Sequence, residues 1–206
     1  MRLSAIRLLI YVLLFSFLFT ACAGTKLTDT WVDKAHKGNQ LSNILVIGFT
    51  FEGNEEVRQK FENSFVKQLI AAGIEAESSM DTIPSPPDME LKKDEILDAV
   101  KKFNSDGVII THLVGKDTKH TVTYQHSIHS SSDLFFFYRS AYDRRGYSRS
   151  SETVYLETNL YDVKTEKLIW SGQSKTFKPD SYNQMFNDLV SKVIEDLKKN
   201  NLIPQK

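Results

Sequence analysis

The stretch TVYLETNLYDVKTEKLIWSG (Thr153–Gly172) decides the fold class. Apolar and polar residues alternate through its first half, with Val154, Leu156 and Leu160 on one side, which is typical of a half-buried β-strand. A short polar turn, KTEK, leads into a second apolar run that ends at Trp170. Two strands joined in this way form an antiparallel hairpin, so the second half of the chain is predicted to contribute antiparallel strands to a sheet.

The residues before the hairpin predict a different connection. NILVIGF (Asn43–Phe49), IEAES (Ile74–Ser78) and DGVIITHLV (Asp106–Val114) have the length and composition of strands. Helices are predicted between them, the first capped by Asn54 and stopped at Gly73. The apolar positions of the first helix are Val57, Phe61, Phe65 and Leu69, and those of the second are Ile96, Leu97, Val100 and Phe103. This alternation favours parallel strands joined by helical crossovers.

A final helix is predicted to begin at Asp180 or Ser181, with Gln184 completing a capping box. The chain without its first 21 residues has the length of one domain. We therefore expect a single α+β domain of the two-layer α/β type over residues 43–202. It should hold a mixed β-sheet with about three helices packed mainly on one face.

The N-terminal sequence MRLSAIRLLIYVLLFSFLFTACAG combines a basic start, a short apolar centre and a small-residue end. This is the pattern of a secretory signal peptide over residues 1–21, because the apolar stretch is shorter than the roughly 20 residues of a membrane span. LFTAC resembles the lipobox of bacterial lipoproteins, in which the cysteine is diacylated and becomes the new N-terminus. Cys22, the one cysteine of the chain, is therefore predicted to be lipidated. Residues 22–42 are predicted to be a polar tether that joins the domain near Trp31 and Val32.

The lipobox implies a lipid-anchored protein of the bacterial cell envelope, and Ala23 after the cysteine favours the outer membrane, facing the periplasm. Two alternatives stay open at this point. One is a plain cleaved signal peptide with an incidental cysteine, and the other is a free thiol.

Three motifs together resemble a family of small uncharacterised bacterial envelope lipoproteins: WVD soon after the lipobox, then ILVIGF, then the YDxxTxKLxWSG hairpin. The hairpin residues are Tyr161, Asp162, Thr165, Lys167, Leu168, Trp170, Ser171 and Gly172. Glu166 stands where the family usually has a turn glycine. The family is distantly similar in fold to envelope assembly lipoproteins, including the curli secretion pore subunit and peptidoglycan-synthase activators. The resemblance implies a binding or assembly role.

Charge and motifs exclude several function classes. Residues 1–21 hold two arginines and no acidic residue, so 24 Lys and Arg remain against 26 Asp and Glu, and this net charge offers no general attraction to nucleic acid or anionic lipid. SFVK (Ser64–Lys67) has the serine–lysine spacing of penicillin-interacting enzymes, but it falls within a predicted helix and lacks the partner motifs. We predict no enzyme activity, no cofactor and no small-molecule substrate.

The histidines suggest an alternative function. Zinc or copper sites need two or three imidazoles and a carboxylate that converge. Such a site in a periplasmic metal-binding lipoprotein would use His120, His126, His129 and Asp133. The competing interpretation is a set of solvated polar histidines in a strand end and a serine-rich loop. His112, within a predicted strand, is interpreted as structural.

The segment SSSDLFFFYRSAYDRRGYSRSSE (Ser130–Glu152) combines aromatic residues with arginines and lacks a helix or strand period. Such long loops are uncommon, and Tyr and Arg dominate interface hot spots. A partner-binding loop is therefore predicted at about 128–152, with the candidate residues Phe136, Tyr138, Arg139, Tyr142, Arg144, Arg145 and Tyr147. Its partner would be another envelope protein or a second copy. Alternatively, the phenylalanines cover the sheet and the arginines are solvated.

Overall fold

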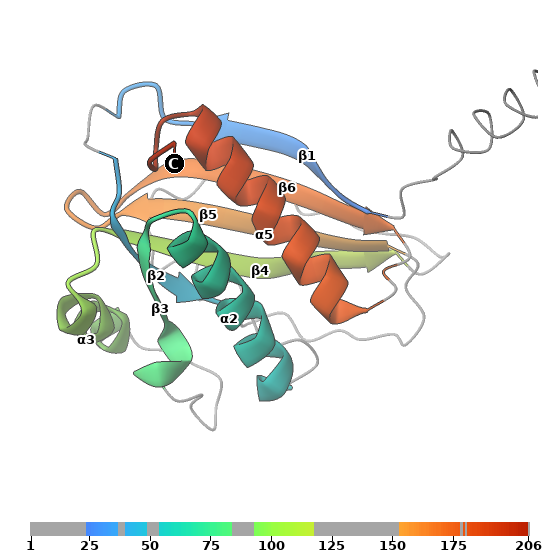
Figure 1. Cartoon of the computed structure of the whole chain (residues 1–206), viewed down its shortest axis with the longest axis horizontal. Helices are drawn as coiled ribbons and strands as arrows, with labels where there is room; N and C mark the ends of the chain where they lie inside the picture. Colours follow the sequence, from blue (N-terminus) through green and yellow to red (C-terminus); the bar gives the residue numbers. More distant parts are fainter. Residues whose placement is uncertain are drawn as a thin grey trace, which may run out of the picture.

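Six strands form one mixed β-sheet in the order β1-β6-β5-β4-β2-β3 (Figure 1). This computed structural model describes residues 24–36, 40–48, 54–83, 93–117, 153–177, 179 and 181–205. The elements are β1 Thr25–Val32, β2 Asn43–Ile47, α2 Glu55–Ala71, β3 Glu75–Ser78, the 3-10 turn η2 Ser79–Asp81, α3 Lys93–Phe103, β4 Gly107–Asp117, β5 Thr153–Asp162, β6 Lys167–Phe177 and α5 Tyr182–Lys199. The predicted α+β class with a mixed sheet is confirmed.

The first half of the sheet is parallel. β2 pairs in parallel with β3 on one side and with β4 on the other, and α2 and α3 are the two crossovers. The side chain of Asn54 caps α2 by accepting hydrogen bonds from the backbone N–H groups of Glu56 and Val57, as the sequence predicted. The helix ends at Ala71, just before the predicted stop at Gly73.

The second half of the sheet is antiparallel. β5 pairs with β6 from Thr153↔Phe177 to Asp162↔Lys167, which confirms the hairpin. In its turn, Asp162 Oδ1 accepts hydrogen bonds from the Thr165 N–H and hydroxyl at 2.7 and 2.6 Å. Glu166 has a φ of 55°, the left-handed conformation that a glycine adopts without steric cost.

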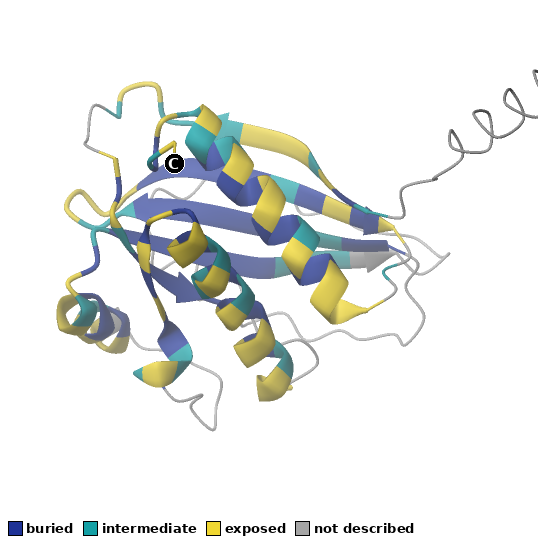
Figure 2. Ribbon diagram, in the orientation of Figure 1, coloured by how far each residue is buried: buried dark blue, intermediate teal, exposed yellow. Residues whose placement is uncertain are grey.

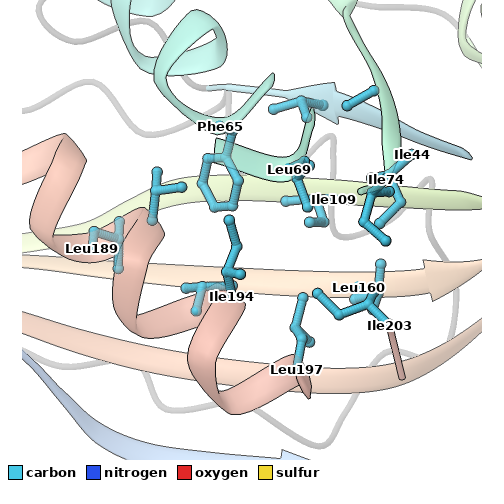
Figure 3. Packing of buried hydrophobic residues seen from close by; sticks show 14 of the residues in the cluster. Ile44, Phe65, Leu69, Ile74, Ile109, Leu160, Leu189, Ile194, Leu197 and Ile203 are labelled. Carbon is cyan, nitrogen blue, oxygen red and sulfur yellow. The ribbon is translucent and has the colours of Figure 1, made fainter. Parts of the chain in front are cut away.

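The larger hydrophobic core lies between the sheet and helices α2 and α5, whose outer faces are exposed (Figure 2). Phe65 and Leu69 of α2 point toward Ile109 of the sheet, and Leu197 of α5 lies beside Leu160 (Figure 3). A fully buried aromatic cluster joins the two helices, because the ring of Phe61 makes edge contacts with those of Phe65 and Phe186.

A second core lies on the opposite face of the sheet, against α3. Ile96, Ala99 and Val100 pack on Val108 and on other buried residues of β2, β4, β5 and β6. Two of the three described helices therefore share one face, as predicted, and α3 covers part of the other.

β1 corrects the prediction of a tether over residues 22–42. Thr25–Val32 is an edge strand that pairs with β6, so the folded domain includes these residues and does not start at residue 43. The strand escaped prediction because only one edge of it is paired and exposed residues such as Asp29 interrupt its apolar pattern. An irregular register between Leu27 and Asp29 interrupts the alternation further.

Candidate functional site

A buried carboxylate network lies where β2 and β3 end. Glu62 of α2 is fully buried, and its Oε1 accepts hydrogen bonds from the Gly48 N–H at 2.8 Å and from Ser79 Oγ at 2.9 Å. Its Oε2 accepts from Ser78 Oγ at 2.6 Å and from the Met80 N–H at 3.1 Å. One side chain thus joins the helix to the segments that follow both parallel strands.

Arg58 supplies the positive charge in this network. Its Nε lies 2.8 Å from Glu62 Oε1, and both side chains are inaccessible to solvent. Its Nη2 donates to Ser79 Oγ at 2.7 Å, so Ser79 accepts from the arginine and donates to the carboxylate. Hydrogen bonding of this completeness offsets the large cost of desolvating an ion pair.

Gly48 permits the backbone to approach this carboxylate. A Cβ atom at position 48 would lie 2.8 Å from Phe61 Cδ1 and 3.0 Å from Glu62 Cγ. Any other residue would therefore move α2 away from β2 and lengthen the hydrogen bond to Glu62. The glycine and the buried pair act together to fix the position of α2.

The network occupies the place where open α/β sheets bind ligands, at the carboxyl ends of parallel strands whose crossovers lie on opposite faces. Donors of the protein already occupy both oxygens of the Glu62 carboxylate, three bonding Oε1 and two bonding Oε2, so the group is suited to holding structure. We assign the network to positioning the chain around this end of the sheet.

The sequence predictions missed this network. Arg58 and Glu62 are four residues apart, the spacing of an ordinary surface ion pair such as Glu56 and Lys60 on the same helix. The signal that could have identified the network is helical spacing: Arg58 and Glu62 fall on the same helical stripe as the core residue Phe65.

A second group of polar residues is buried on the α3 side of the sheet. His112 of β4 is 4% exposed, and its Nε2 lies 3.9 Å from Glu157 Oε2 on β5, which agrees with its predicted place in a strand. Asn159 Nδ2 donates to Glu157 Oε1 at 3.3 Å, and Ser171 of β6 is also fully buried. These residues form a polar row across the three central strands.

The residues predicted from sequence to bind or to be modified lie outside the described residues. They are Cys22, the histidines His120, His126 and His129 with Asp133, and the loop residues Phe136, Tyr138, Arg139, Tyr142, Arg144, Arg145 and Tyr147. Ser64 is described, and its hydroxyl donates to Asn187 Oδ1 at 2.8 Å between α2 and α5.

The described ranges contain neither a cluster of metal-ligating side chains nor a helix that could span a membrane. No group of three or more His, Cys, Asp or Glu side chains in these ranges has the arrangement of a metal site. No helix among them has the length and hydropathy needed to cross a membrane.

Comparison with known proteins found similarity only to solved structures. No family model and no curated protein matches the sequence. The PelC dodecamer from Paraburkholderia phytofirmans is 13% identical, with a TM-score of 0.46, over 88% of this chain and 99% of that one. A variant of that dodecamer is 13% identical, with a TM-score of 0.43, over 84% and 97% of the two chains.

A PDZ domain protein from Parabacteroides distasonis is 12% identical, with a TM-score of 0.39. The match covers 89% of this chain and 37% of the other.

Proposed function

We propose that this protein is a lipid-anchored component of the bacterial cell envelope that works by binding or assembly and is not an enzyme. The anchor is Cys22, and the domain faces the periplasm from the outer membrane. The lipobox-like stretch LFTAC and the signal-peptide pattern before it support the anchor. Several acyl chains on one residue give a stable attachment, whereas one chain gives a marginal one.

The observation that carries the proposal is the short stretch of sequence between Cys22 and the first strand of the sheet. β1 begins at Thr25, three residues after Cys22. Three residues of fully extended chain span about 10 Å. A lipid on Cys22 would therefore hold the end of the sheet directly at the membrane surface.

The same end of the sheet carries the two chain ends of the predicted binding loop. Asp117, the last residue of β4, is the register partner of Thr153, the first residue of β5. Thr153 is in turn the partner of Phe177, next to Thr176, which pairs with Thr25. We call this end, defined by Thr25, Asp117, Thr153 and Phe177, the anchor end. A partner bound by residues 128–152 would be met close to the membrane.

Labelling with an alkyne analogue of palmitate tests the anchor. The wild-type chain should take up the label and sediment with membranes, whereas Cys22→Ser should do neither. Ala23→Ser is the matched control, because it changes the neighbouring residue and keeps the thiol. Equal labelling of the wild type and Cys22→Ser would contradict the proposed anchor.

Photocrosslinking from position 142 tests the binding role. A photoreactive residue in place of Tyr142 should give a discrete adduct to another envelope protein in the membrane fraction. Substituting alanine at Tyr138 and Arg145 should abolish this adduct and leave the melting temperature nearly unchanged. A large fall in melting temperature would instead assign these side chains to packing, and adducts to the chain itself alone would indicate self-association.

A further inference from the structure

Two exposed aromatic side chains lie at the anchor end, on opposite faces of the sheet. Phe177, the last residue of β6, is 48% exposed, and Tyr182, the first residue of α5, is 39% exposed. Ile70 is the other large hydrophobic side chain of comparable exposure in the described ranges, and it lies near the end of α2. Tyrosine is enriched at membrane–water interfaces, and phenylalanine is among the side chains that interfacial segments bury at the boundary with the acyl chains.

Contacts place Tyr182 beside the start of β1. The hydroxyl of Thr25 donates to the carbonyl oxygen of Met185, in the first turn of α5, at 3.5 Å. The ring of Tyr182 stacks on that of Phe186, with centroids 6.1 Å apart. The beginnings of β1 and α5 and the end of β6 lie at the same side of the molecule (Figure 1).

Ile70 lies at the opposite end. The chain after α2 runs through Ile74, whose N–H donates to the Leu69 carbonyl oxygen, to the first residue of β3. Glu75, the first residue of β3, pairs with Asn43, the first residue of β2. Because β2 runs in parallel with β4 toward the anchor end, both of these residues lie at the other end of the sheet. Ile70 therefore provides an exposed apolar position away from Cys22.

Two lysines add positive charge at the anchor end. Lys26 of β1 and Lys175 of β6 are direct register partners, and both are exposed. Within the described ranges, neither ammonium group has an acidic partner, and Lys175 lies over the ring of Tyr155 at 5.5 Å. Like charges directly opposite each other destabilise a strand pair, so an anion between them would relieve this cost.

We infer that the anchor end is a membrane-docking surface for anionic phospholipid, in which Phe177 and Tyr182 enter the interface and Lys26 and Lys175 bind headgroup phosphates. The inference rests on the proposed lipid anchor, and it adds that the folded domain itself contacts the bilayer. A lipid on Cys22 would keep Thr25 within about 10 Å of the headgroups. This distance is close to the Debye length of about 8 Å at physiological salt, so the lysines lie within range of the anionic surface.

Fluorescence quenching in vesicles tests the docking surface. Acylation turns the one thiol of the chain, at Cys22, into a thioether, so a cysteine introduced at 177, 182 or 70 is the single site for a bimane label. The acylated full-length variants Phe177→Cys, Tyr182→Cys and Ile70→Cys are reconstituted in phosphatidylethanolamine–phosphatidylglycerol vesicles with brominated acyl chains. We expect most of the fluorescence to be lost at 177 and 182, and almost none at 70.

Charge removal tests the role of the lysines in the same assay. Each lysine near an anionic surface contributes about a fivefold factor to association, so Lys26→Gln with Lys175→Gln should lower the docking equilibrium constant about 25-fold. The same pair of substitutions should have no effect in vesicles of phosphatidylcholine alone. An equal effect in both lipids would contradict the assignment of the lysines to anionic headgroups.

The outcomes separate this inference from the proposed function. An acylated chain without quenching at 177 and 182 would overturn the docking surface and leave the anchor intact. A chain that carries no lipid and leaves the vesicles would overturn both. A blue shift that grows with the protein-to-lipid ratio, without quenching, would assign the surface to a second copy and contradict the inference.

Discussion

Replacing Glu62 by glutamine leaves the buried Arg58 guanidinium without its carboxylate. The side chains of both residues are inaccessible to solvent, and Glu62 accepts five hydrogen bonds from Gly48, Arg58, Ser78, Ser79 and Met80. Breaking a buried ion pair by removing one partner costs about 3–5 kcal/mol. With a urea m-value of about 2 kcal/mol/M, the unfolding midpoint should fall by about 2 M.

Equilibrium urea unfolding of the acylated protein in detergent, followed by circular dichroism, measures this change. Glu56→Gln is the matched control, since Glu56 lies on the same helix and bonds Lys60 at the same spacing, 2.6 Å apart and in solvent. This control should leave the midpoint unchanged, because exposed pairs contribute little.

A double variant separates two causes of the lost stability: the unpaired Arg58 charge and the hydrogen bonds that Glu62 no longer accepts. Arg58→Met combined with Glu62→Gln removes both charges and should be more stable than Glu62→Gln alone, because no unpaired charge stays buried. The reasoning is refuted if Glu62→Gln shifts the midpoint no more than Glu56→Gln does.

Three further predictions concern packing, turn geometry and pH. Gly172→Ala should destabilise the domain by about 1–3 kcal/mol in the same urea assay, since a Cβ there would lie 2.4 Å from Cη2 of the buried Trp170 ring. Glu166→Gly should keep or raise the unfolding midpoint, because the φ of 55° at this turn position favours glycine; a clear fall would contradict this. The hydrogen bond and charge of Lys60 hold the pKa of the Glu56 carboxyl below 4.5, so the small stabilisation from this pair should be lost only as the pH falls below that value. An NMR titration should show this low midpoint in the wild type and a return toward 4.5 in Lys60→Met.

The regular elements of the fold could be predicted because their signals are local. The hairpin strand before Asp162, the cap at Asn54 and the cap at Ser181, whose side chain accepts from the Gln184 N–H, lie where the sequence predicts them. The prediction that this strand is half-buried was wrong, because both of its faces are buried in the structure, including Glu157, Asn159 and Tyr161 on the face predicted to be polar. β1 could not be predicted, because an edge strand is held by backbone pairing with β6, and its exposed side chains carry little apolar pattern.

The polar groups in the interior were harder to foresee for a different reason. The spacing of Arg58 and Glu62 is the same whether the pair is buried or exposed, and burial follows from the packing of α2 over residues that are distant in sequence. Ser79, which completes the network, is 17 residues from Glu62. The polar row of His112 and Glu157 likewise requires the register of β4 on β5, which a single sequence does not reveal.

The intact mass of the mature chain, extracted from membranes of the native host, tests the lipid anchor most directly. We predict a chain that begins at Cys22 and carries a diacylglyceryl group on its sulfur. A chain that starts at another residue, or one that starts at Cys22 with a free thiol, would contradict the account.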